Sequence, residues 1–167
     1  MQNIFKKFEK IHEFEIKRRN LPHWQQPGGV YFLTFRTNHL ILNDIQKDIV
    51  HNHILKHNKS KYILYSFVIM PDHVHLVLQP LDLLGRFYSL AEIMQSIKGG
   101  SSREINIKFN STGFQNWQKE SFDRIIRNEK EFNEKLEYIK NNPVKNGLID
   151  NGLDYKWFFL YSSNPNN

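Results

Sequence analysis

Runs of apolar residues, some alternating with polar ones, predict four β-strands. They cover residues 30–37, 62–70, 73–79 and 121–126. The first run alternates, so its polar face carries Thr34 and Arg36 while its other face is apolar. Only Pro71 and Asp72 separate the second run from the third, and a short turn of this kind predicts that the two runs pair as a hairpin.

Three helices are predicted by capping signatures, in which a polar N-cap residue is followed three positions later by Glu or Gln. The pairs are Asn43 with Gln46, Ser89 with Glu92, and Asn128 with Glu131. The run Gly99-Gly100-Ser101-Ser102 interrupts the pattern after the second helix, so we expect that helix to end there.

The predicted order of elements is strand, helix, strand, strand, helix, strand, helix. This order is typical of an α+β fold with a split βαβ arrangement, an antiparallel sheet and helices packed on one face, and it places residues 73–79 on a central strand. A chain of 167 residues that is 40% hydrophobic can form one core and is too short to expect two. We therefore expect a single domain over residues 1–167, with a basic N-terminal arm in 1–29 and a disordered tail in 162–167.

Composition bears on both the partner and the possible metal ligands of this protein. A formal net charge of +6 and an aromatic content of 14% favour a polyanionic partner such as nucleic acid, although a merely basic protein would carry the same charge. The absence of cysteine excludes disulfides and thiolate ligands, which leaves imidazole, carboxylate and amide groups for any metal ion. Neither a secretory signal nor a membrane-spanning segment is recognisable, so we expect a cytoplasmic protein.

The strongest chemical signal is a pair of histidines one residue apart, His73 and His75, on the third predicted strand. Side chains alternate along a strand, so both imidazoles point to one side while Val74, Leu76 and Leu78 point to the other. Two nitrogen donors on one rigid element predict a metal site in a polar pocket. Taken alone, such a pair also occurs on partly exposed strands that bind no metal.

The last predicted helix carries a tyrosine away from its apolar stripe, which consists of Phe132, Leu136 and Ile139. Tyr138 and Asn142 are one turn apart and should project together, and Pro143 followed by Gly147 predicts that the helix ends shortly after them. A phenol has a pKa of about 10, so it attacks a phosphate poorly at neutral pH unless a base or a cation assists. The other interpretation of Tyr138 is an amphipathic ring at the edge of the core.

Five motifs follow one another in a fixed order along almost the whole chain. They are Arg18-Arg19-Asn20-Leu21-Pro22-His23-Trp24, Pro71-Asp72-His73-Val74-His75, Trp117-Gln118, Phe122-Asp123-Arg124-Ile125-Ile126-Arg127-Asn128, and the run from Tyr138 to Leu148. Together they resemble the single-tyrosine transposases of the His-hydrophobic-His class, and within that class the REP-associated tyrosine transposases. The combination is far more specific than any one motif.

The resemblance implies a ferredoxin-like fold that binds folded-back single-stranded DNA, nicks it at a specific phosphodiester and rejoins it. Carried onto this chain, Tyr138 is the nucleophile that becomes joined to the 5′ phosphate while a 3′ hydroxyl leaves. His73 and His75 are ligands of a divalent ion, Mg²⁺ or Mn²⁺, that activates the phosphate, with Asn142 as the candidate third ligand. The implied partner is single-stranded or hairpin DNA, with no membrane and no nucleotide cofactor. A monomer is expected, and a dimer with shared sites is the alternative.

Basic and aromatic side chains in or near these motifs are candidates for DNA contacts. They are Arg18, Arg19, Trp24, Lys98, Arg103, Trp117, Arg124, Arg127 and Lys145. Each also has a structural interpretation, such as a surface ion pair for an arginine or a place at the margin of the core for a tryptophan. Gly100 departs from the bulkier residue expected in the resembled family, which affects local DNA contacts and leaves the predicted chemistry intact.

Two other functions stay open on the sequence. A non-catalytic DNA- or RNA-binding protein with this fold would bind strands without divalent ions and without a covalent product. A metal-dependent phosphodiesterase that uses water at the histidine pair would cleave without Tyr138.

Overall fold

A five-stranded antiparallel sheet forms the centre of the computed structural model, which describes residues 25–161. Its strands lie in the order β6-β1-β3-β2-β7. Their bounds are β1 (Val30–Thr37), β2 (Tyr62–Ile69), β3 (His73–Pro80), β6 (Trp117–Ile126) and β7 (Phe158–Leu160). A separate two-stranded ribbon consists of β4 (Asp82–Leu83) and β5 (Arg86–Phe87).

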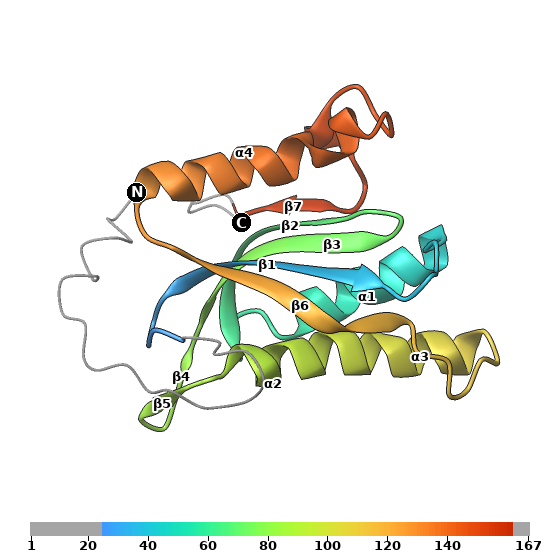
Figure 1. The fold of residues 1–167 in the computed structure, drawn as a ribbon, viewed down its shortest axis with the longest axis horizontal. Coiled ribbons are helices and arrows are strands. Elements are labelled where there is room, and N and C mark those ends of the chain that lie inside the picture. The colour runs from blue at the N-terminus through green and yellow to red at the C-terminus, as the bar shows by residue number, and fades with distance from the viewer. Residues whose placement is uncertain (1–24, 162–167) are drawn as a thin grey trace.

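Helices cover both faces of the sheet (Figure 1). Their bounds are α1 (Asp44–Lys56), α2 (Leu90–Met94), the π-helical turn η2 (Gln95–Gly99), α3 (Gly100–Lys108), α4 (Glu129–Lys145) and the short 3-10 helix η3 (Gly152–Asp154). Helix α1 and the continuous helix formed by α2, η2 and α3 lie on one side, and α4 lies across the other. None of the helices in residues 25–161 is both long enough and apolar enough to cross a membrane.

The central strand of the sheet is β3, which pairs with β1 on one side and with β2 on the other, both antiparallel. β1 and β2 are therefore parallel to each other with β3 inserted between them, which is the split βαβ arrangement. β6 pairs antiparallel with the outer side of β1. The sheet is ferredoxin-like, the predicted α+β fold class is confirmed, and the histidine pair lies on a central strand. The sequence pattern does not predict β7, because three apolar residues are too few to show alternation.

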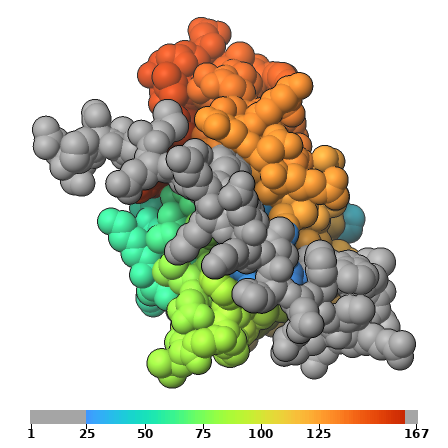
Figure 2. Space-filling view, turned by 90° about the vertical axis from the view of Figure 1, so that its left-hand side faces the viewer, coloured from blue at the N-terminus to red at the C-terminus, as the bar shows by residue number. Residues whose placement is uncertain are grey.

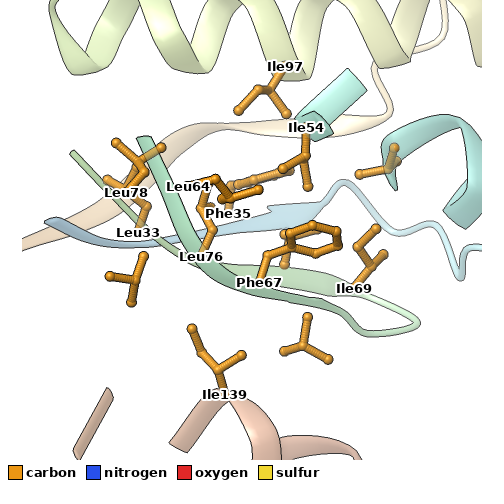
Figure 3. Packing of buried hydrophobic residues seen from close by; sticks show 14 of the residues in the cluster. Leu33, Phe35, Ile54, Leu64, Phe67, Ile69, Leu76, Leu78, Ile97 and Ile139 are labelled. Carbon is orange, nitrogen blue, oxygen red and sulfur yellow. The ribbon is translucent and has the colours of Figure 1, made fainter. Parts of the chain in front are cut away.

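The expectation of helices on one face holds for α1, α2 and α3, whereas α4 lies on the opposite face. Both faces of β3 are buried, and each needs a cover. On the first face, Phe35 meets Trp117 edge to face at 4.8 Å, and the Trp117 indole donates a hydrogen bond of 3.1 Å to Ser101 of α3. In Figure 3, Ile97 lies on that side of the sheet and Ile139 of α4 lies on the other.

The helices begin at the predicted capping residues. Asn43 and Ser89 each form a complete capping box with the residue three positions later. Asn128 accepts a hydrogen bond of 2.9 Å from the backbone N–H of Glu131, but the Glu131 carboxylate turns to the backbone of Arg127 and the side chain of Arg124. The third capping box is therefore half formed, and its acidic residue links α4 to β6.

The predicted break at Gly99 and Gly100 is wrong, because the helix continues through residues 90–108. A Cβ on Gly100 would lie 2.6 Å from Nδ1 of His53 in α1, which is closer than real Cβ atoms approach another atom. The His53 ring is itself held by a contact of 2.9 Å between its Nε2 and Glu104. Gly100 thus permits α1 and α3 to approach each other closely. The local sequence does not reveal this contact, because His53 is distant along the chain.

Gly100→Ala should destabilise the protein by about 1–3 kcal/mol, because the new methyl group displaces the His53 ring. In a His53→Ala background the same change should instead stabilise the protein by roughly 0.5–1 kcal/mol, since alanine is the better helix former. Urea unfolding of the wild type, both single variants and the double variant measures the four free energies. An equal loss in both backgrounds would contradict the packing role of Gly100.

Candidate active site

His73 and His75 lie side by side on the face of β3 that α4 covers. Both are buried, with 8% and 5% of each residue exposed, and their ring centroids are 4.7 Å apart. The intervening Val74 points into the opposite core, where it pairs with Phe35 of β1. The two rings therefore converge, as the alternation along the strand predicts.

Each histidine is oriented through its Nδ1 atom. Asp72 Oδ1 lies 2.6 Å from Nδ1 of His73, and Thr34 Oγ1 lies 2.7 Å from Nδ1 of His75. Asp72 also accepts a hydrogen bond of 3.0 Å from Arg36, which pairs with His73 across the β1–β3 ladder. With both Nδ1 atoms engaged, the Nε2 atoms are the nitrogens left for an ion or a substrate, an arrangement typical of metal-binding histidines.

Burial and charge set the protonation of this cluster. Burial, followed by electrostatic interactions with His73 and Arg36, lowers the pKa of His75 to about 3, so its ring is neutral at physiological pH. Burial alone would raise the pKa of Asp72, but the hydrogen bond to His73 and the charges of His73 and Arg36 lower it below its usual value. A neutral His75 imidazole can offer its free nitrogen to a metal ion, since a metal-bound imidazole must be deprotonated at the ligating nitrogen.

Tyr138 of α4 completes the cluster from the other side. Its hydroxyl oxygen lies 3.3 Å from Nε2 of His75, and the residue is 39% exposed. Phe32 of β1 stacks on the His75 ring at 5.4 Å and meets the Tyr138 ring edge to face at 5.8 Å. The phenol is therefore held beside the histidine pair while part of it stays open to solvent. These groups all come from one chain.

Two ammonium groups flank the Tyr138 ring. Lys135 Nζ, one helical turn earlier, lies 5.9 Å from the Tyr138 ring centroid and 4.9 Å from that of Phe32. Lys145 Nζ, later in α4, is also 5.9 Å from the Tyr138 centroid. Their charge favours an anionic group such as a phosphate at this place.

Asn142 follows Tyr138 by one turn and is 6% exposed. Its backbone carbonyl accepts hydrogen bonds from the backbone and the side chain of Asn146, and its Oδ1 lies 3.4 Å from Nδ2 of Asn146. Pro143 stands in the last turn of α4, and Gly147 follows with a φ of +66°, so the helix ends where the sequence predicts. The role of Asn142 as a metal ligand stays a prediction.

The donor set fits a divalent ion that takes some of its ligands from water or a substrate. Residues 25–161 contain no cluster of three His, Cys, Asp or Glu side chains that could hold an ion by themselves. The histidine pair offers two oriented nitrogens, and the predicted third ligand, Asn142, is an amide. A partial protein ligand set leaves open positions, as catalytic metal sites require.

Two of the predicted DNA contacts, Trp117 and Lys98, have structural roles within the fold. Trp117 is 4% exposed and its indole N–H is hydrogen-bonded within the core, so it offers no surface for a base. The Lys98 ammonium donates hydrogen bonds to the carbonyls of Gln118 and Lys119 and to the hydroxyl of Ser121. Lys98 therefore links η2 to β6. The two glycines that follow it are helical, so they do not form a phosphate-binding loop.

Other predicted contacts are exposed. Arg103 lies on α3, and Arg124 and Arg127 lie where β6 leads into α4. The segments β6 and α4 form a continuous orange surface in Figure 2. Arg124 forms an ion pair of 2.7 Å with Glu131. A groove at this junction is lined by Arg124, Arg127, Asn128, Lys130, Glu131, Glu134 and Lys135. Three further candidates, Arg18, Arg19 and Trp24, lie outside the described residues.

Sequence reasoning missed Phe32, Thr34 and Lys135. Thr34 stands on the predicted polar face of its strand, but only the β1–β3 register shows that it lies opposite His75. Lys135 is three residues before Tyr138, and that helical spacing is a signal that could have identified it. A phenylalanine in a strand carries no comparable signal, so Phe32 is recognisable only from the structure.

Similar proteins are found among transposases. A curated relative from Haemophilus influenzae, whose name assigns it provisionally to the REP-associated tyrosine transposases, is 24% identical over 146 residues and covers 78% of each chain. A REP-associated tyrosine transposase from Escherichia coli K12 is 26% identical over 133 residues, which cover 77% of this chain and 74% of the relative. The fold is similar to a solved structure of a REP-associated tyrosine transposase bound to a REP hairpin. That comparison has a TM-score of 0.65 and 21% identity, and covers 86% of this chain and 81% of the other.

A family model described as "Transposase IS200 like" matches residues 31–142. The matched range extends from β1 into the last turns of α4. It therefore includes the histidine pair, the Thr34 hydroxyl that orients it, Tyr138 and Asn142. Because the match covers more than half of the chain, this protein belongs to the IS200-like transposases, a family of enzymes that move DNA.

Proposed function

We propose that this transposase nicks and rejoins single-stranded DNA through a 5′-phosphotyrosine on Tyr138. The observation that carries the proposal is the distance of 3.3 Å between the Tyr138 hydroxyl and Nε2 of His75 within one chain. A nucleophile beside two oriented imidazoles is the arrangement that metal-assisted covalent phosphoryl transfer needs.

In this reaction the Tyr138 oxygen attacks the scissile phosphorus, and the bond from phosphorus to the 3′ oxygen breaks. The phenol loses its proton, the departing 3′ oxygen takes one up, and the 5′ phosphate stays joined to Tyr138. A DNA 3′ hydroxyl that attacks the phosphotyrosine reverses these changes and reseals a strand, so no nucleotide cofactor is consumed. Lys135 and Lys145 stabilise the negative charge that gathers on the phenolate and the phosphate.

The proposed cofactor is a divalent ion, Mg²⁺ or Mn²⁺, held by His73 and His75 with Asn142 as the third protein ligand. When bound, the ion would polarise the scissile phosphate and offset part of its charge. Two imidazole ligands favour Mn²⁺ over Mg²⁺, which prefers oxygen ligands. Asp72 and Thr34 keep the two rings oriented through their contacts with Nδ1.

The proposed substrate is folded-back single-stranded DNA, such as a repetitive extragenic palindrome. The similar solved structure is of a protein bound to a REP hairpin, and the curated relatives are named for the same association. A formal charge of +6 and the exposed arginines at the β6–α4 junction suit a polyanion. Since the tyrosine and the histidines lie in one chain, we propose a single-domain monomer as the active unit, in the cytoplasm.

Tyr138→Phe should abolish the covalent protein–DNA product and preserve DNA binding, because it removes only the nucleophilic oxygen. The ring keeps its contact with Phe32, so the free energy of unfolding should change by less than about 0.5 kcal/mol. A denaturing gel of each protein, incubated with a library of labelled hairpin DNAs and Mg²⁺ or Mn²⁺, measures the covalent product.

The same gel separates the alternatives. Normal cleavage by the Tyr138→Phe variant would rule out this tyrosine as the nucleophile. Cleavage by both proteins without a covalent band indicates hydrolysis by water at the histidine pair. Tight binding by both proteins with no cleavage of any hairpin indicates a non-catalytic nucleic-acid-binding protein.

Thr34→Val should weaken Mn²⁺ binding about 10- to 100-fold, since it removes the hydroxyl that orients His75 and keeps the shape of the side chain. Thr34→Ser retains the hydroxyl and should bind Mn²⁺ nearly as well as the wild type. Calorimetric titration of the DNA-free proteins with Mn²⁺ measures these affinities. A valine variant with wild-type affinity would show that the hydroxyl does not position the ligand.

A further inference from the structure

Phe122 is an exposed aromatic residue beside the candidate active site. It lies on β6, the edge strand next to β1, and is 58% exposed. It pairs across the strands with Thr34, which in turn pairs with His75. Directly paired residues point to the same face of a sheet, so Phe122, Thr34 and His75 form one row across three strands.

The distance from Phe122 to His75 along this row corresponds to only a few nucleotides of a DNA strand. Neighbouring strands are about 4.8 Å apart, so roughly 10 Å separates Phe122 from His75. Stacked nucleotides advance about 3.4 Å each along one strand. A base two or three nucleotides from a phosphate at Tyr138 would therefore be within reach of Phe122.

Basic side chains stand near Phe122 on the same face. Arg124, two residues along β6, pairs with Phe32, and Arg36 of β1 pairs with His73. Their side chains are 55% and 52% exposed, although each has a carboxylate partner. An exposed ring with two arginines on the same face of the sheet complements a strand that presents free bases and phosphates, whereas a duplex offers no free base face.

We propose that Phe122 is a stacking platform for a base of the single-stranded DNA that flanks the scissile phosphate, with Arg36 and Arg124 beside the neighbouring phosphates. The path of the DNA rests on the proposed function, but the stacking contact itself requires no cleavage. A DNA partner also gives a reason for a large apolar side chain on an exposed strand edge, where such residues otherwise favour aggregation.

Phe122→Ala should weaken the binding of an oligothymidylate of about twelve nucleotides by roughly five- to 100-fold, the usual loss for one base stacked on an aromatic ring. Binding of an abasic strand of the same length should not change, because that strand carries phosphates but no bases. Phe122→Trp should keep the wild-type affinity for both strands. Fluorescence anisotropy of the labelled strands, with EDTA present, measures these affinities.

Phe114→Ala is the matched control. Phe114 is also an exposed aromatic residue, at 46%, but it lies in the loop between α3 and β6. Its loss should leave the affinity for both strands unchanged. Both alanine variants should unfold in urea within about 0.5 kcal/mol of the wild type, because the rings they lose are exposed.

Three results would overturn the stacking contact. They are equal losses on the oligothymidylate and the abasic strand, no loss for Phe122→Ala relative to Phe114→Ala, and no binding of oligothymidylate by the wild type. EDTA removes divalent ions, so the outcome does not depend on cleavage. Base-dependent binding through Phe122 in a protein that forms no Tyr138 adduct would support the stacking contact and reject the proposed reaction.

Discussion

The register between β1 and β3 is the constraint on which the candidate active site depends. It places Thr34 opposite His75 and Arg36 opposite His73, so a hydroxyl and a cation reach the histidine motif. A shift of one residue would turn these side chains to the other face and bring apolar side chains in their place. The same register buries the apolar residues of both strands on the opposite face. Hydrophobic packing on one face of the sheet therefore also fixes the positions of the polar side chains on the other face.

The second half of the site comes from a helix that the C-terminal segment holds in place. Ile139 of α4 is fully buried against the sheet, and the adjacent Tyr138 reaches His75. After α4, the chain returns through η3, where Gly152 lies so close to α4 that a Cβ would overlap the carbonyl oxygen of Lys140. β7 then joins the sheet beside β2. This close approach, together with the added strand, fixes the helix that carries the candidate nucleophile.

Net charge is a poor guide to the basic residues that could contact DNA. Lys98 binds main-chain oxygens of β6, and Lys47 pairs with Asp44 and lies over the Trp157 ring. These lysines hold the fold together, whereas Lys135 flanks the candidate nucleophile. A count of charges treats both groups alike, while burial and hydrogen-bond partners separate them.

The sequence by itself determined the order of the four long strands and the three capped helices, the convergence of His73 and His75, and the family, because alternation, helix caps and motifs are properties of local sequence. It also indicated that Tyr138 lies off the apolar stripe of its helix, but not that this helix covers the histidines. Only the tertiary structure decided that α4 packs on the second face of the sheet, that Thr34 orients His75, and that the two glycines are helical. Each of these depends on the register between strands or on the close approach of segments far apart in the chain. A pattern of local residues does not record such contacts, since they arise only when distant segments pack together.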